Sequence, residues 1–464
     1  MSKKTRTILI CVLISLFFLI TPILILYSQG YRFDFNSPDG GIKITQTGGL
    51  FLKVLPKNTE VFLDGKLNEK TSFFFGSVYI DNLLPKKYNI RVEKEGYNIW
   101  EKNLEVKEKE VIEAKNIILI PKNLELQTLS QQVEDFWILS KEKVILKEIS
   151  EDEWALKIFN LENNLKSHLI SEKEISKKEP ELLELKISPN GEKVILKIGL
   201  KERLEHFILD LTESPNKLIF FDSLLPEPDI EKLDFHPQEP NIIFFFKNEK
   251  LFEFELSENS SQLVLEGILT YKILENSIYY IDKSGYIFKN NSSFGFEEKI
   301  NNVPFPLKKE IKYTLKVEQG FIFILENNIL YLFNPEKKDF EKIFEPIKNT
   351  KISPDGKKIL YFNEHEIWTM FLEEQKEQPK KEAMAKQFLN RFSEKINNVS
   401  WLNSHYLIFN LEGKIKVIEI DDRDKMNNYE LYSGIKKFNW SSEFKQLYIL
   451  TKKNSLNFIS LTSF

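Results

Sequence analysis

A ten-residue cassette occurs twice in this chain, at Ile187–Leu196 and at Ile352–Tyr361. Each copy contains Ile-Ser-Pro, then Asn-Gly or Asp-Gly, two charged residues and an apolar run. Proline fixes one turn dihedral, Asn or Asp tolerates the left-handed region, and glycine supplies a positive φ without steric cost. The apolar run is typical of a buried strand. Because a strand–turn–strand unit is copied at long range, the sequence predicts a repeat architecture.

Weaker copies of this pattern fill the rest of the chain beyond about residue 122. They lie at residues 133–146, 233–246, 271–281, 315–325, 399–409 and 438–450. Their spacing of roughly 35 to 50 residues is close to the ~40–45 of a four-stranded propeller blade. The 38 Phe and 16 Tyr residues favour sheet. A parallel solenoid needs shorter and more even repeats. We therefore predict a β-propeller of seven or eight blades over residues 122–464.

Two cassettes carry a family resemblance. Ser188-Pro189-Asn190-Gly191 and Ser353-Pro354-Asp355-Gly356, each followed by an apolar strand, resemble the repeats of TolB-type β-propellers. One stretch interrupts the series, because residues 373–395 are rich in charge and poor in apolar side chains. We expect this stretch to be an exposed insertion between strands, partly helical, that lies over one propeller face.

The amino terminus contains an uncharged apolar run, Ile8–Tyr27. Its length is close to the ~20 residues that cross a hydrocarbon core of ~30 Å. Basic residues stand before the run at positions 3, 4 and 6, and mixed charges follow it at 32, 34 and 39. The positive-inside rule then places the amino terminus in the cytoplasm and the bulk of the chain outside it. We predict a single-pass signal anchor over residues 1–28, in the cytoplasmic membrane.

The alternative is a cleaved signal peptide. Such a peptide has an apolar region of about 7–15 residues and small residues before its cleavage site. Leu26–Gly30 offers no such pair, so the uncleaved anchor is favoured. Cys11 is the only cysteine and lies inside the apolar run, after Ile8–Ile10. Lipoprotein processing, an intrachain disulfide and a cysteine-based metal site are therefore not expected.

A compact β pattern follows a linker at residues 29–48, which contains Gly30, Pro38, Gly40, Gly41 and Gly48. Between residues 49 and 121 we expect short strands. They are Leu50–Val54, Val61–Leu63, Lys87–Glu93, Leu104–Val106 and Ile117–Ile120. The run from Lys87 to Glu93 alternates with a period of two, as a half-buried strand does.

This region resembles the PEGA domain, a small β-sandwich of envelope proteins. The matching residues are Pro56, Val61-Phe62-Leu63-Asp64-Gly65-Lys66, Leu84-Pro85, Tyr88 and Gly96-Tyr97. The chain departs from the family at Pro56-Lys57-Asn58-Thr59, which replaces Pro-Glu-Gly-Ala, and at Lys86, where glycine is preferred. The resemblance implies interactions at the cell surface or envelope and no catalytic residues. The predicted fold class is mainly β: one transmembrane helix, a PEGA-like sandwich and a propeller.

Residues that could support catalysis or metal binding do not form a recognisable site. The histidines at 168, 206, 236, 365 and 405 lack ligand spacing. Ser188 and Ser353 lie outside any Gly-x-Ser-x-Gly elbow, so turn capping explains them better than nucleophilic attack. Asp64-Gly65 and Asp355-Gly356 lack the further ligands of a calcium loop. We expect no enzyme, no cofactor and no metal, and the ligand-binding residues stay unassigned.

The charge balance limits the partners. The 65 basic and 69 acidic side chains are spread along the chain, which argues against nucleic acid. We expect a membrane-anchored binding or scaffold protein of the bacterial cell envelope, with the propeller as a platform for proteins or peptides. The alternative is recognition of a cell-wall or surface polysaccharide by exposed aromatic rings. Phe73–Phe75 are the candidates for that, since Phe244–Phe246 and Trp401 are better explained as strand core. A hydrolase with a site at the propeller channel is a weaker third hypothesis.

Overall fold

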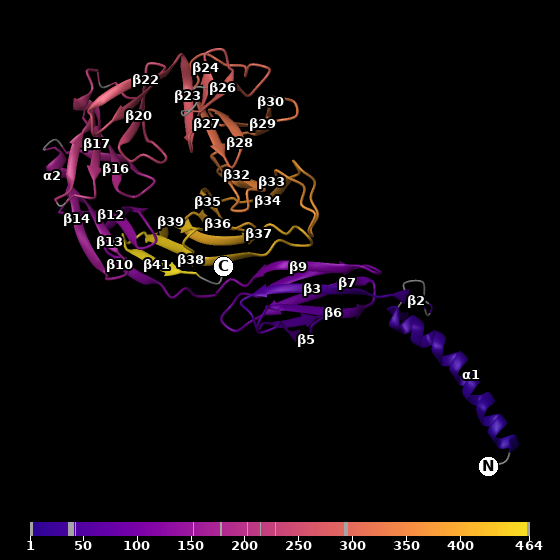
Figure 1. Ribbon diagram of the computed structural model, residues 1–464. Helices are drawn as coiled ribbons and strands as arrows, with labels where there is room; N and C mark the ends of the chain where they lie inside the picture. The colour runs from indigo at the N-terminus through magenta and orange to yellow at the C-terminus, as the bar shows by residue number, and fades with distance from the viewer. Residues whose placement is uncertain are drawn as a thin grey trace.

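The computed structural model describes residues 3–35, 41, 43–151, 153–176, 179–201, 203–213, 215–227, 229–291 and 296–461. Figure 1 shows a long amino-terminal helix, a small β domain and a ring of β-sheets in this order along the chain. The chain is mainly β, as expected. The remaining short helices are α2 (Glu172–Ile175) and the 3-10 helix Phe221–Leu224.

Helix α1 (Lys3–Ser28) contains the apolar run and projects away from both β bodies (Figure 1). The most apolar 18-residue stretch within its residues 4–28 has a mean hydropathy of 3.1, and none of that stretch is buried against the rest of the chain. Among the described residues it is the one helix long and apolar enough to cross a membrane, a test that a signal sequence also passes.

Part of the expected linker is ordered instead as a two-stranded sheet. β1 (Tyr31–Asp34) pairs antiparallel with β2 (Lys43–Gln46), with Tyr31 opposite Gln46. These two strands were not expected within the linker, because four-residue strands are too short to show periodicity beside many glycines. Pro38 and Gly40 lie outside the described residues.

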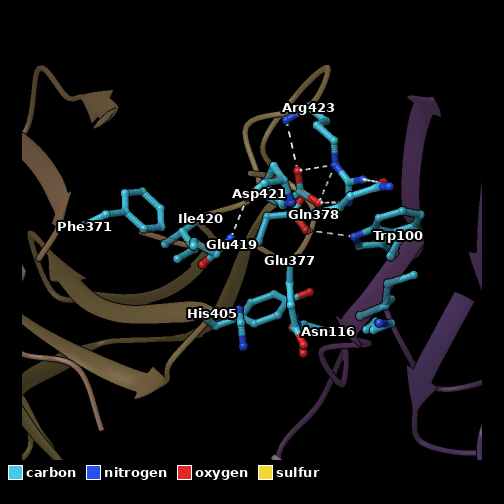
Figure 2. A pocket seen from close by; sticks show the side chains of 16 residues that line it. Trp100, Asn116, Phe371, Glu377, Gln378, His405, Glu419, Ile420, Asp421 and Arg423 are labelled. Atoms are coloured by element: carbon cyan, nitrogen blue, oxygen red, sulfur yellow. Dashed lines mark hydrogen bonds and ion pairs between the residues drawn. The ribbon is translucent and has the colours of Figure 1, made fainter. Parts of the chain in front are cut away.

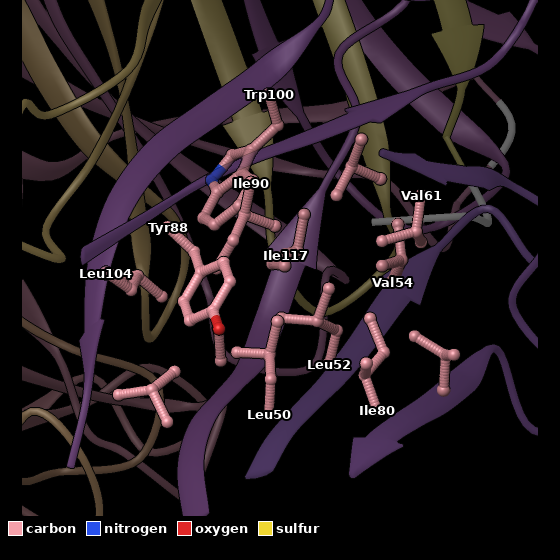
Figure 3. Close-up of a cluster of buried hydrophobic side chains, with 14 of the residues drawn as sticks. Leu50, Leu52, Val54, Val61, Ile80, Tyr88, Ile90, Trp100, Leu104 and Ile117 are labelled. Carbon is pink, nitrogen blue, oxygen red and sulfur yellow. The ribbon is translucent and has the colours of Figure 1, made fainter. Parts of the chain in front are cut away.

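Two sheets form the small domain. One has the order β6-β3-β9 and the other β5-β4-β7-β8. Their bounds are β3 (Gly48–Leu55), β4 (Glu60–Leu63), β5 (Lys66–Lys70), β6 (Ser77–Leu83), β7 (Lys86–Glu93), β8 (Trp100–Val106) and β9 (Val111–Ile118). Side chains from both sheets, among them Leu52, Ile90 and Trp100, meet in one buried core (Figure 3). The domain is therefore a β-sandwich.

Two positions explain why glycine is needed in this domain. Gly48 begins β3, where a Cβ atom would lie only 2.3 Å from the carbonyl oxygen of Lys107. Asp64 and Gly65 connect β4 to β5 with φ of 47° and 77°, as a tight hairpin requires. The Asp64 carboxylate accepts hydrogen bonds from the Asn89 backbone N–H and from Lys86. Asp64-Gly65 thus has a structural role.

Eight four-stranded sheets make up the ring, and we number these blades 1 to 8 along the chain. Blade 1 is β11 (Val133–Ile138), β12 (Lys143–Ser150), β13 (Glu153–Asn160) and β14 (Leu165–Ser171). Blade 2 is β15 (Glu181–Ile187), β16 (Lys193–Leu200), β17 (Arg203–Asp210) and β18 (Lys217–Phe220). Blade 3 is β19 (Lys232–Phe235), β20 (Ile242–Lys247), β21 (Lys250–Glu255) and β22 (Ser260–Glu266). Blade 4 is β23 (Ile268–Leu274), β24 (Ser277–Asp282), β25 (Ile287–Asn291) and β26 (Phe296–Lys299).

The remaining blades repeat this order. Blade 5 is β27 (Tyr313–Glu318), β28 (Phe321–Glu326), β29 (Ile329–Asn334) and β30 (Asp339–Phe344). Blade 6 is β31 (Asn349–Ile352), β32 (Lys358–Phe362), β33 (Glu366–Phe371) and β34 (Lys386–Arg391). Blade 7 is β35 (Ile396–Asn403), β36 (Tyr406–Leu411), β37 (Lys414–Glu419) and β38 (Asn428–Ser433). Blade 8 is β39 (Ile435–Ser441), β40 (Gln446–Thr451), β41 (Leu456–Ser460) and β10 (Gln127–Ser130).

Every neighbouring pair of blades shares one buried apolar cluster, including blade 8 with blade 1. The blades therefore form a closed β-propeller, with the eight blades that the repeat count favoured. Closure uses both ends of the propeller segment, because β10 pairs antiparallel with β41. The Thr128 hydroxyl donates to Asn457 Oδ1 at 2.8 Å across this pair.

The charged stretch at 373–395 differs from its expected form. The structure assigns no helix there. Residues 373–385 are an irregular connection, and β34 follows as the outer strand of blade 6, with Phe388 opposite Trp368. The strand was missed because only Gln387 and Leu389 are buried on it, among exposed polar neighbours. The connection contacts the small domain rather than lying over a propeller face.

Candidate functional site

The small domain docks on blade 7 through a buried ion pair. Strand β8 supplies Trp100 and Lys102, and the end of β37 supplies Glu419 (Figure 2). The Trp100 indole N–H donates to Glu419 Oε2 at 2.8 Å, and Lys102 Nζ lies 2.9 Å from Glu419 Oε1. The Lys102 and Glu419 side chains are only 0% and 4% exposed. The two bodies are thus joined by charges that are fully withdrawn from water.

The partners around this pair satisfy both charges. Lys102 also donates to the backbone carbonyls of Asp421 and Arg423, which accounts for its three N–H donors. Asn427 donates to Glu419 Oε1 from its backbone N–H at 2.8 Å and from its side chain at 2.7 Å. Burial raises the pKa of Glu419, and the Lys102 ammonium opposes this shift. Such a pair is tolerated only when its hydrogen bonds are complete.

The connection at 373–385 closes the edge of β9, an outer strand of the small domain. The Gln378 Oε1 atom accepts from the Glu113 backbone N–H, and Gln378 Nε2 donates to the Val111 carbonyl, both at 3.0 Å. Arg423 Nη1 donates to the Glu113 carbonyl at 2.8 Å. The Gln378 amide therefore replaces a neighbouring strand, which protects the edge from pairing with other chains.

A cavity of about 40 Å³ remains at this junction, lined in part by Trp100, His405, Asp421 and Arg423 (Figure 2). Its size suits one or two ordered waters rather than an organic ligand. Burial, together with the Lys358 ammonium, lowers the pKa of His405 to about 4. We interpret the junction as the structural connection between the two bodies.

Acidification is expected to weaken the fold between pH 6.5 and about 4. In the unfolded chain His405 takes up a proton near pH 6.5, whereas in the folded chain it stays neutral until about pH 4. The unfolded state binds more protons than the folded state in this window. The free energy of unfolding therefore decreases as the pH is lowered. Between pH 7 and pH 5, urea titrations should show a loss about 2 kcal/mol larger in the wild type than in His405→Gln. The same loss in both proteins would contradict this assignment.

The propeller encloses a second and larger cavity, along its axis. Its volume is about 900 Å³, and its wall is formed by the first strands of blades 2 to 6. The charged residues that line it are four lysines and two carboxylates: Lys186, Lys232, Lys272, Lys316, Asp234 and Glu318. The first strand of each blade is therefore the inner one, and the cavity is a channel with a largely basic wall.

The cassette serines lie in the turns between the first two strands of their blades. Ser188 Oγ accepts from the Lys193 backbone N–H at 2.9 Å, and Ser353 Oγ accepts from that of Lys358 at the same distance. Each hydroxyl donates in turn to the Asn190 or Asp355 side chain. These bonds hold the turn together, and neither serine is paired with a histidine.

The five histidines are dispersed over the ring rather than brought together. His168 and His206 lie on β14 and β17, while His236, His365 and His405 lie in connections of blades 3, 6 and 7. His206 Nδ1 lies 3.1 Å from Asp222 Oδ1, in a buried pair. Within the described part of the chain, no three His, Cys, Asp or Glu side chains gather as a potential metal site.

The aromatic candidates separate clearly by exposure. Phe244–Phe246 and Trp401 are buried between blades. Phe73–Phe75 are 72–74% exposed in the connection between β5 and β6. They are the candidates that could contact a ligand through their rings.

Sequence reasoning missed the junction and the basic channel. No local signal in the sequence indicated the junction, since Trp100 and Glu419 are 319 positions apart.

A local signal did indicate the basic channel. The repeat copies contain Leu-Lys-Ile at 185–187, Tyr-Lys-Ile at 271–273, Leu-Lys-Val at 315–317 and Thr-Lys-Ile at 350–352. A lysine at the same position of an inner strand in four copies predicts a basic ring.

Comparison with known proteins finds likeness only among solved structures. No family model matches the chain, and no curated protein matches it. The computationally designed Ika8 protein aligns over 73% of this chain and 98% of its own, at 10% identity and a TM-score of 0.45. A eukaryotic initiation factor aligns over 74% and 89%, at 11% identity and a TM-score of 0.46. The Cps50 (Swd1) beta-propeller domain of Myceliophteria thermophila aligns over 60% and 95%, at 10% identity and a TM-score of 0.34. The propeller assignment rests on the chain's own eight sheets.

Proposed function

We propose that this chain is a membrane-anchored, extracytoplasmic scaffold whose propeller is a binding platform for proteins or peptides. The observation that carries the proposal is the buried junction, which fixes the ring to the domain that follows the apolar helix. A ring fixed in this way is held in one orientation relative to its anchor. The amino-terminal basic residues support a cytoplasmic amino terminus.

The proposal includes the finer family assignments. The Asp64-Gly65 hairpin and the two-sheet core support a PEGA-like small domain, and the serine-capped turns support a TolB-like propeller. We propose a binding role rather than an enzymatic one, because the cassette serines and His206 have structural partners and the five histidines are dispersed over the ring.

Photo-crosslinking in cells tests whether the propeller binds proteins or peptides. A photoreactive amino acid at Gln319, which is exposed and lines the channel, should give protein adducts. The same probe at Gln262, exposed on the outer strand β22, is the matched control and should give none. Adducts that disappear on protease treatment are proteins. No protein adduct from Gln319, or equal adducts from both positions, would contradict the proposal.

Recognition of a polysaccharide is the second candidate, and the exposed Phe73–Phe75 triplet is the observation that favours it. Aromatic rings stack on sugar faces, and such exposure of three successive Phe side chains costs solvation free energy. Retention of the protein on purified cell-wall polysaccharide, lost in a Phe73–Phe75 triple serine variant but kept in Leu67→Ser, would support this alternative. Leu67 is the control because it is also exposed on the small domain.

A further inference from the structure

The inner strands of four blades place a lysine at the same position. Lys186, Lys272, Lys316 and Lys351 occupy it on β15, β23, β27 and β31, and blade 3 has Asp234 there. A fifth lysine, Lys232, lies two residues before Asp234 on β19. All except Lys351 line the 900 Å³ channel. Four successive blades, 2 to 5, thus direct charge toward one cavity, and Lys351 occupies the corresponding position on blade 6.

The carboxylate within this group is already paired. Asp234 Oδ1 lies 2.8 Å from Lys186 Nζ, and its Oδ2 lies 3.0 Å from Lys232 Nζ. The Tyr271 hydroxyl donates to the same Oδ2 atom at 2.9 Å. These contacts, with the two ammonium charges, hold the pKa of Asp234 at about 2. Asp234 is therefore engaged with Lys186 and Lys232, and Glu318 is the other carboxylate among the residues that line the channel.

Lys272, Lys316 and Lys351 form no ion pair with any described carboxylate. Lys316 Nζ donates to Asn349 Oδ1 at 2.9 Å, a neutral acceptor. Glu318 is the acidic residue whose field reaches Lys316 and Lys351, and one of its oxygens lies 3.4 Å from the Ile352 backbone nitrogen. Lys272 and Lys316 thus present positive charge to the channel, Lys351 lies near Lys316, and Glu318 offsets part of the charge of this group.

Burial and mutual repulsion both act on these ammonium groups. Burial lowers the pKa of Lys316, and the Lys272 charge lowers it as well. Burial likewise lowers the pKa of Lys351, with a contribution from Lys316. Like charges held together in a partly enclosed space raise the local concentration of anions. An anionic ligand would relieve the repulsion among these lysines.

We propose that the channel binds an acidic peptide segment, with its carboxylates paired to Lys272, Lys316 and Lys351. This rests on the proposed platform function and specifies the chemistry of its ligand. The three lysines come from successive blades, so their charges are spread along the wall and suit several separate carboxylates. Apolar residues also line the channel, including Phe235, Ile273, Leu274 and Val317. Acidic and apolar positions in alternation match a peptide better than a single small anion.

Binding of peptides to full-length protein in detergent micelles tests whether the lysines of the channel wall recognise carboxylates. A fluorescent peptide that alternates Glu with Leu is compared with its Gln-for-Glu counterpart. We expect the acidic peptide to bind about tenfold more tightly and to lose affinity as salt is raised. A Lys272→Gln, Lys316→Gln, Lys351→Gln triple variant should remove that difference. A triple variant at Lys217, Lys299 and Lys342, on the outermost strands of blades 2, 4 and 5, should keep it.

Several outcomes would overturn the proposal. They are equal affinity for the two peptides, an unchanged affinity in the channel variant, or binding of polyphosphate with none of the acidic peptide. If the channel variant fails to fold, Glu318→Gln replaces it, and this single change should tighten acidic-peptide binding several-fold. Protein adducts from Gln319 that persist in the channel variant would leave the platform in place and refute the channel as its acidic-peptide site.

Discussion

Replacing Lys102 by alanine is expected to release the small domain from the propeller and to lower the free energy of unfolding by about 3–5 kcal/mol. The substitution leaves the Glu419 carboxylate buried without its countercharge. Thermal unfolding should then begin at a lower temperature. Limited proteolysis should also cut the connection between β9 and β10 faster, at exposed residues such as Lys122, because a released domain lets this segment open into a protease.

A matched control lies at the same junction. Lys87 is 62% exposed, and its Nζ is 3.6 Å from Asp424 Oδ1. Lys87→Ala should cost less than about 1 kcal/mol, because an exposed pair is screened by water. Adding Glu419→Gln to the Lys102→Ala variant should recover about 2 kcal/mol, since the uncompensated charge is removed while an acceptor for Trp100 remains. Equal losses for Lys102→Ala and Lys87→Ala would show that the buried pair does not hold the bodies together.

Replacing Leu456 by alanine is expected to destabilise the propeller by about 2–5 kcal/mol. Leu456 lies on β41, is fully buried, and packs in the cluster between blades 8 and 1 together with Phe136 and Leu146. The loss combines missing apolar contact with the cavity left behind. Urea unfolding followed by tryptophan fluorescence measures it.

The control for this prediction is Leu263→Ala. Leu263 is 48% exposed on β22, the outer strand of blade 3, so its truncation leaves no cavity. It should cost less than about 1 kcal/mol. If both variants shift the urea midpoint equally, the contact between the first and last blades does not limit the stability of the ring.

Local chemistry explains which parts of the fold were predictable. The turns at Pro189-Asn190-Gly191 and Pro354-Asp355-Gly356 are encoded within a few residues. The two cassettes therefore predicted the strand pairs β15–β16 and β31–β32 correctly. The apolar run of α1 was equally evident. β10 was missed because four residues carry little pattern, and their partner is distant in sequence.

The functional residues were less predictable because they depend on contacts between distant segments. Nothing near Trp100 or Gln378 in the sequence indicates the partners that they meet. The charge of residues 373–385 suggested solvent, whereas Gln378 serves as an edge cover for β9. The channel lysines are the exception, since aligning the inner strands of the repeats places Lys272, Lys316 and Lys351 in one column.

The closure of blade 8 has a consequence for biosynthesis. Thr128 on β10 and Asn457 on β41 are 329 positions apart, and β10 leaves the ribosome first. At about 5–20 residues per second, β10 waits roughly 16 to 66 s for its partner. Until then the finished blades form an open arc, with the apolar face around Phe136 and Leu146 uncovered. Arrival of the last strand is therefore the step that ends the chain's exposure to misassembly.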